Sequence, residues 1–182
     1  MRTLAALLAL TLCLPVLAKE VAGVQVADSV TAGGKTLALN GAGLRSKLFI
    51  KVYVGALYLE QRSSDPAAIV AADQAWQVVM TFKRDVDKAS ILGAFKEGFE
   101  NNSKADAPQL IPALARIDAV MKDLKSGDVL VIAYAPGTGS TITAPGGGTV
   151  TIEGKPLADA LLRNWLGDKP ADGGLKSGML GK

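Results

Sequence analysis

The stretch LNGAGLRSKLFIKVYVGALYLE, residues 39–60, decides the fold. Its second part, 48–60, is rich in valine, isoleucine, tyrosine and phenylalanine and has no proline, so it is the strongest strand signal in the chain. The even positions from 48 to 58 are apolar or aromatic, whereas the odd positions mix lysine and glycine with large side chains. We therefore expect one face of this strand to pack on a core and the other to be partly polar.

Strand and helix patterns alternate on both sides of this stretch. Further strands are expected at 21–26, 35–40, 76–82, 129–135, 141–143 and 149–152, and the uniformly apolar run 129–135 is typical of a strand buried on both faces. Helices are expected at 65–73, after an Asp87 cap, at 107–125 with Gly127 as the stop, and at 157–166. The tail 167–182 holds five glycines and a proline, so we expect it to lie irregularly on the surface. This order is α+β and favours a large antiparallel sheet with helices on one side.

Residues 1–18 have the features of a secretory signal peptide: Arg2, an apolar run, and Ala18 before the charged pair at 19 and 20. The apolar run is shorter than the ~20 residues that a membrane-spanning helix needs. We therefore expect cleavage after Ala18, a single domain at 19–182, a periplasmic or secreted location, and no stable membrane span after processing. A retained single-span anchor is the alternative.

The composition excludes several classes of protein. The sole cysteine, Cys13, lies in the expected leader, so the expected mature domain has no thiol nucleophile. The chain has no histidine, which excludes Ser-His triads and zinc or haem held by histidine. We expect no metal and no cofactor. The net charge of +3 is mild, and basic residues do not cluster with aromatic ones, so nucleic acid is not an expected partner.

Residues 39–60 resemble the chalcone isomerase superfamily. The likeness rests on Gly-x-Gly-x-Arg at 41–45, followed by Phe49, Lys51, Gly55 and the ending Leu-Tyr-Leu-Glu at 57–60. It continues in the opening hairpin 24–40, the strand and helix at 79–99, and the last helix at 156–167. The resemblance implies a chalcone isomerase-like open-faced sandwich, in which a large antiparallel sheet packs against a layer of helices.

The superfamily holds two functions, and both use the arginine that matches Arg45. Plant isomerases close a flavanone ring, whereas fatty-acid-binding members hold a carboxylate with an arginine and a tyrosine. Tyr53 stands where the isomerases keep a threonine, and it is the residue that the fatty-acid binders use. The helix tyrosine and asparagine of the isomerases fall on Ala89 and Lys96. The resemblance therefore favours a binder of a fatty acid or a similar amphipathic anion over an enzyme.

The candidate ligand-binding residues are Arg45, Tyr53 and Asn164. Asn164 lies on the apolar stripe of the last helix, where it is either a satisfied core amide or a ligand donor. No catalytic residue is assigned. The alternative function, an intramolecular lyase of the chalcone isomerase type on an unknown substrate, would use Arg45 as electrophile and Tyr53 or Asn164 to position a water. A third alternative is an interaction module whose cleft is vestigial.

The spacing of Arg45 and Tyr53 raises a question of geometry. Eight residues of uninterrupted strand span about 26 Å, too far for one carboxylate. The two converge only if residues 46 and 47 reverse the chain and fold Arg45 back alongside Phe49 and Ile50. Otherwise Arg45 would snorkel to a surface carboxylate and Tyr53 would have a solvated hydroxyl. We expect Lys47 and Lys51, on the same face as Tyr53, to be solvated.

Overall fold

The structure is a computed structural model that describes residues 19–104 and 106–182. The expected signal peptide, with Cys13 and the cleavage point after Ala18, lies outside the described residues. The helices and strands described below all lie in residues 19–104 and 106–182.

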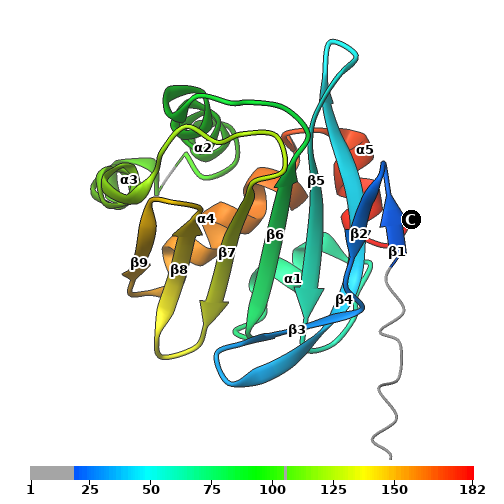
Figure 1. Cartoon of the computed structure of the whole chain (residues 1–182). Helices are drawn as coiled ribbons and strands as arrows, with labels where there is room; N and C mark the ends of the chain where they lie inside the picture. The colour runs from blue at the N-terminus through cyan, green and yellow to red at the C-terminus, as the bar shows by residue number, and fades with distance from the viewer. Residues whose placement is uncertain (1–18, 105) are drawn as a thin grey trace, which may run out of the picture.

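Seven strands form one antiparallel sheet, and each pairs with its neighbours in sequence. They are β3 (Ser29–Ala32), β4 (Lys35–Lys47), β5 (Ile50–Leu59), β6 (Trp76–Phe82), β7 (Val129–Ala135), β8 (Gly139–Ala144) and β9 (Gly148–Ile152). The sheet curls, and helices gather on one face (Figure 1). The expected strand 21–26 is instead a two-stranded ribbon of β1 (Lys19–Val21) and β2 (Val24–Val26), because Ala22 and Gly23 form a turn with positive φ.

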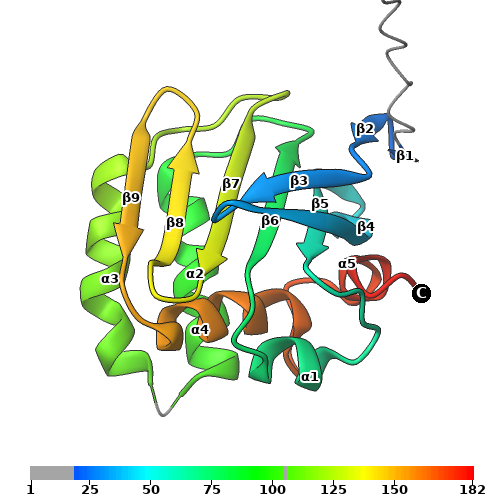
Figure 2. The ribbon, with the colours of Figure 1, turned by 90° about the horizontal axis from the view of Figure 1, so that it is seen from below.

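Five helices are described: α1 (Pro66–Ala71), α2 (Lys88–Asn102), α3 (Ala107–Val120), α4 (Lys155–Leu166) and α5 (Gly173–Met179). Asp87 caps α2 as expected, since its carboxylate accepts a hydrogen bond from the Ser90 amide at 2.8 Å. α4 runs beneath the sheet and contacts α1 and α2 (Figure 2). The expected α+β architecture is thus confirmed. Within the described residues, no helix is long and apolar enough to cross a membrane.

The core has two parts, one on each face of β5. The odd positions Leu57 and Leu59 point into the main core beneath the helices, whereas Val54, Ala56 and Tyr58 pack in a second cluster with residues of β2, β3 and β4. The expectation of a partly polar face on this strand is therefore wrong, because the curl of the sheet and the β1–β2 ribbon cover its second face. Strand β7 was expected to be buried on both faces. Its residues instead alternate between buried and more exposed, so only one face is fully buried.

Two boundaries in the second half of the chain differ from the sequence prediction. Helix α3 ends at Val120, and Met121 adopts an extended conformation. Leu124 then pairs with Val86 through two backbone hydrogen bonds of 2.8 and 2.9 Å. Met121 and Leu124 are buried although they lie outside the helix. Their apolar spacing therefore made the predicted helix too long. Gly127 forms a turn with φ +94° rather than a helix stop.

The tail is not irregular, because it contains α5. The Asp172 carboxylate caps the helix by accepting from the Leu175 amide at 2.9 Å, and Leu175 and Met179 are fully buried. The helix lies directly on β4, where a Cβ on Gly43 would stand 3.0 Å from the Cα of Leu175. The glycines of the strand thus provide the space for this helix.

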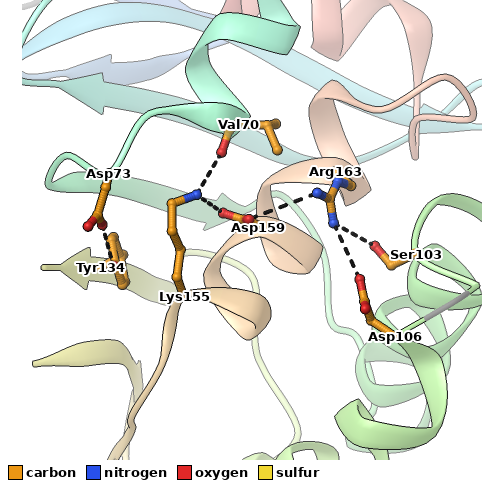
Figure 3. A network of polar contacts seen from close by, with 8 residues as sticks. All are labelled: Val70, Asp73, Ser103, Asp106, Tyr134, Lys155, Asp159 and Arg163. Carbon is orange, nitrogen blue, oxygen red and sulfur yellow. Dashed lines mark hydrogen bonds and ion pairs between the residues drawn. The ribbon is translucent and has the colours of Figure 1, made fainter. Parts of the chain in front are cut away.

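A polar network holds the outer face of α4 in place (Figure 3). Asp159 pairs with Lys155 and, at 3.9 Å, with Arg163. Lys155 donates to the Val70 carbonyl in α1, and Arg163 reaches Asp106 between α2 and α3 at 3.9 Å. The network fixes the helix that carries Asn164 and Trp165.

Candidate ligand-binding site

The β4–β5 hairpin brings Arg45 and Tyr53 together. They are direct partners in the ladder, and the guanidinium carbon of Arg45 lies 5.7 Å from the centre of the Tyr53 ring. The chain reverses at Leu48 and Phe49, both with positive φ, and not at residues 46 and 47. The strand that was expected to begin at 48 therefore begins at Ile50, and Arg45 lies opposite Tyr53 rather than beside Phe49 and Ile50. A bulge after Arg45 adjusts the register.

A cavity of about 460 Å³ opens beside this pair, within the range of small-molecule sites. Its walls come from the hairpin, β6, α2 and α4. Apolar side chains form the interior: Val52, Met80, Phe82, Ile91, Phe95 and Trp165. Charged residues also line it: Arg45, Lys47, Arg84, Asp85, Asp87 and Glu97. The arrangement suits a molecule with an apolar body and a charged end.

Arg45 lines the cavity, and its guanidinium lies over the ring of Tyr53. Its Nε is buried and has no hydrogen-bond partner, and its guanidinium forms no ion pair with any residue that the structure describes. The alternative in which Arg45 snorkels to a surface carboxylate is therefore not observed. A guanidinium remains charged at physiological pH and presents a donor fork that fits a carboxylate.

Tyr53 is buried, and its hydroxyl is not solvated. The oxygen accepts a hydrogen bond from the indole Nε1 of Trp165 at 2.9 Å. Because an indole only donates, the hydroxyl hydrogen of Tyr53 is left to donate, and it has no acceptor within the described chain. Burial raises the pKa of Tyr53 to about 12, although Arg45 and the Trp165 hydrogen bond oppose the shift. Tyr53 is therefore a neutral donor at physiological pH.

Asn164 is buried on α4 and lines the same cavity. Neither its amide oxygen nor its amide nitrogen has a partner in the described part of the chain. Helix α2 admits this amide because position 98 is glycine, where any Cβ would collide with it. Buried amides are nearly always hydrogen-bonded, and an amide without partners is therefore unusual. Of the two alternatives for Asn164, the satisfied core amide is not found.

The structure brings all three candidate residues to one cavity and adds Trp165, which the sequence interpretation missed. The signal was an aromatic residue with an N–H group directly after Asn164.

Ala89 and Lys96 do not line the cavity, whereas their neighbours Ser90 and Glu97 do. Lys47 and Lys51 are exposed, as expected. Among residues 19–104 and 106–182, no group of three or more acidic, cysteine or histidine side chains could hold a metal ion.

Comparison with known proteins identifies the family of the chain and its fold. A family model described as chalcone isomerase-like matches residues 18–181. The chain belongs to the chalcone isomerase-like family. A crystal structure of an Arabidopsis thaliana fatty-acid binding protein is similar to it, with a TM-score of 0.69 and 16% sequence identity over 87% of this chain and 92% of that one. At this identity the likeness establishes the chalcone isomerase-like fold alone. No curated protein matches the sequence.

Proposed function

We propose that this chalcone isomerase-like protein is exported and binds a fatty acid or a similar amphipathic anion, without catalysing a reaction. The observation that carries the proposal is Arg45, a cation with an unpartnered Nε beside an apolar cavity. A carboxylate that enters such a cavity loses its hydration, and a fixed cation with hydrogen bonds offsets that loss. The fatty-acid binding of the Arabidopsis protein with the same fold supports this choice of ligand.

Each polar group of the cavity makes a different contact with the ligand. Arg45 supplies the positive charge, Tyr53 donates its free hydroxyl hydrogen, and Asn164 offers its amide N–H groups to the head group or to a water beside it. The apolar residues of β6 and α2, such as Phe82 and Phe95, contact the acyl chain. Each polar group without a protein partner thus gains one when the ligand binds.

Native mass spectrometry of the purified protein, followed by titration of the delipidated form with long-chain carboxylates, tests the proposal. We expect Arg45→Ala to weaken binding by about 3 kcal/mol because it leaves a buried anion unpaired. Arg45→Lys should recover part of this loss, and Tyr53→Phe should cost about 1 to 3 kcal/mol. The matched control is Arg62→Ala, which removes an exposed arginine that does not line the cavity.

The same experiment can reject the proposal. If the protein carries no acid, and Arg45→Ala binds added carboxylates as well as the parent does, the cleft is vestigial and the interaction-module alternative replaces binding.

The isomerase alternative relies on the same three residues and is tested separately. The residues of α2 that face the cavity are Ser90, Ile91, Gly93, Ala94, Phe95 and Glu97, and none offers the phenol that the plant isomerases use. We therefore expect no loss of chalcone absorbance above buffer. Turnover that Arg45→Ala abolishes would favour the enzyme.

Export is the second part of the proposal. The three regions of a signal peptide in 1–18 indicate that the mature chain begins at Lys19. Mass spectrometry of the exported protein should find Lys19 at its N-terminus, whereas an intact Met1 would restore the single-span anchor.

A further inference from the structure

The tip of the β4–β5 hairpin, residues 48–50, exposes three consecutive large apolar side chains. Leu48 is 83% exposed, Phe49 102% and Ile50 48%. The hairpin rises beyond the other strand ends, so the tip stands clear of the sheet (Figure 1). Ile111 and Val129 are the other exposed large apolar residues in the described chain, and they are single residues on other elements. An apolar cluster in water is costly unless something covers it.

The backbone of the tip is strained by its side chains. Leu48 and Phe49 have φ of +48° and +68°, the left-handed conformation of a two-residue hairpin turn. Asn-Gly suits that turn, whereas bulky residues adopt it at a cost. A turn that keeps leucine and phenylalanine in this conformation holds them at the extreme end of the hairpin, which indicates a function for their exposure.

Positive charge surrounds the tip. Lys47 and Lys51 flank it, are exposed, and make no ion pair within residues 19–104 and 106–182. The adjacent end of β6 adds Lys83, whose amide donates to the Val52 carbonyl, and then Arg84. Of the nearby acids, Asp85 pairs with Lys125 at 2.9 Å, and Asp172 accepts a hydrogen bond from the Ser46 amide at 3.1 Å. The tip is an apolar centre with a basic border.

We propose that residues 48–50 insert into the interface of an anionic phospholipid bilayer. Apolar side chains at a protruding tip enter the boundary between head groups and acyl chains, and the flanking lysines remain at the level of the lipid phosphates. Charge complementarity favours this partner, because basic residues near an anionic surface strengthen membrane binding. Leu48 and Ile50 also line the cavity, so a docked protein would present the cavity mouth to the bilayer.

Flotation of the full chain with phosphatidylglycerol-containing vesicles tests the proposal. We expect Phe49→Gly to reduce partitioning about tenfold through the loss of apolar area. The variant should still fold, because glycine suits the left-handed turn position. Ile111→Ser, which removes an exposed apolar residue from α3, is the matched control and should float like the parent.

Charge variants and salt provide an independent measurement. Lys47→Gln and Lys51→Gln should each reduce partitioning roughly fivefold, and purely phosphatidylcholine vesicles or high salt should give a similar reduction. A Phe49→Trp variant should show a blue shift of its emission with anionic vesicles, since Trp76 and Trp165 are already buried.

Two outcomes would overturn the proposal. If Phe49→Gly floats as well as the parent, the tip does not attach the protein to the bilayer. If the protein instead dimerises without vesicles, and Phe49→Gly abolishes the dimer, the tip is an interface between two copies.

Membrane docking and ligand binding can fail separately. Phe49 does not line the cavity, so Phe49→Gly should bind soluble carboxylates normally while losing flotation. Asn164→Leu should float normally while binding carboxylates less tightly.

Discussion

The β4–β5 ribbon carries small side chains toward one end and large ones toward the other, on the same face of the sheet. At one end Gly41, Gly43 and Gly55 let α5 lie against the backbone. Two residues nearer the hairpin turn on each strand, the positions of Gly43 and Gly55 are followed by the large side chains of Arg45 and Tyr53. The cavity opens beside these two side chains. One end is closed by backbone packing, and the other is held open by side chains.

The comparison shows how one continuous strand pair can contribute to both the core and the candidate site. A helix can approach a sheet closely only where Cβ atoms are absent, so the glycines determine where α5 lies. The cavity begins where they end. The following predictions test this division, in order of decreasing effect on the free energy of unfolding.

Gly41→Ala should have the largest effect. A Cβ at this position would collide with the Gly178 carbonyl and stand 2.8 and 2.9 Å from backbone atoms of Gly181 and Met179. Backbone atoms cannot rotate away as a flexible side chain can, so we expect a loss of about 3 kcal/mol in chemical denaturation. Hydrogen exchange should also show lost protection in α5. A variant as stable as the parent would mean that the glycines do not position the helix.

The ionisation of Tyr53 should have the next largest effect. The phenol is protonated in both states below pH 10, but between pH 10 and about pH 12 it ionises only in the unfolded chain. The folded state then binds one more proton, so the free energy of unfolding falls by about 2 kcal/mol across this range. Denaturation at several pH values should show a shallower decline for Tyr53→Phe. The pKa of Tyr134, also raised to about 12, affects both proteins equally. Equal slopes would place the Tyr53 hydroxyl in water.

Asn164→Leu should raise the free energy of unfolding and lower the affinity for a carboxylate ligand. The substitution removes a buried amide without partners in the described chain, so we expect a gain of about 1 kcal/mol in thermal or chemical denaturation. Affinity for a long-chain carboxylate should fall about fivefold in the same preparation, the equivalent of one neutral hydrogen bond. A loss of stability would show that the amide has a structural partner.

Gly93→Ala should have the smallest effect and the opposite sign to Gly41→Ala. Gly93 lies within α2 at the cavity, and a Cβ there meets no atom within 4 Å. Because alanine favours a helix over glycine, we expect a gain of about 0.5 to 1 kcal/mol in the midpoint analysis of urea unfolding. Destabilisation would indicate that α2 packs more tightly than the open cavity implies.

The sequence was sufficient for elements whose signals are local. The Asp87 cap, the strand Trp76–Phe82 and the antiparallel order follow from neighbouring residues, and the structure has all three. It was not sufficient for α5, because glycine-rich composition indicates irregular structure unless the glycines of β4 are known to face it. The local clues were Asp172 three residues before Leu175, and the four-residue spacing of Leu175 and Met179.

The candidate site shows the same limit. Arg45, Tyr53 and Asn164 came from a family resemblance, and they do line one cavity. The turn that joins the first two was misplaced by two residues, because Leu48 and Phe49 have no turn signature and adopt positive φ against their preference. The Trp165 hydrogen bond to Tyr53 spans 112 positions, so no sequence window contains both partners.

The covering of the ribbon by α5 has a consequence for the order in which the protein folds. The sheet is a meander, so each hairpin can form from adjacent residues with a small entropy of loop closure. The contact between Asn40 and Met179 spans 139 positions and must wait for α5 to be available. During synthesis from the N-terminus, the glycines of β4 would remain exposed to water until residues 173–179 have been made. The Asp172 carboxylate, which accepts from the Ser46 amide, would then join the hairpin beside Arg45. A chain interrupted before that point would have a sheet but an unfinished candidate site.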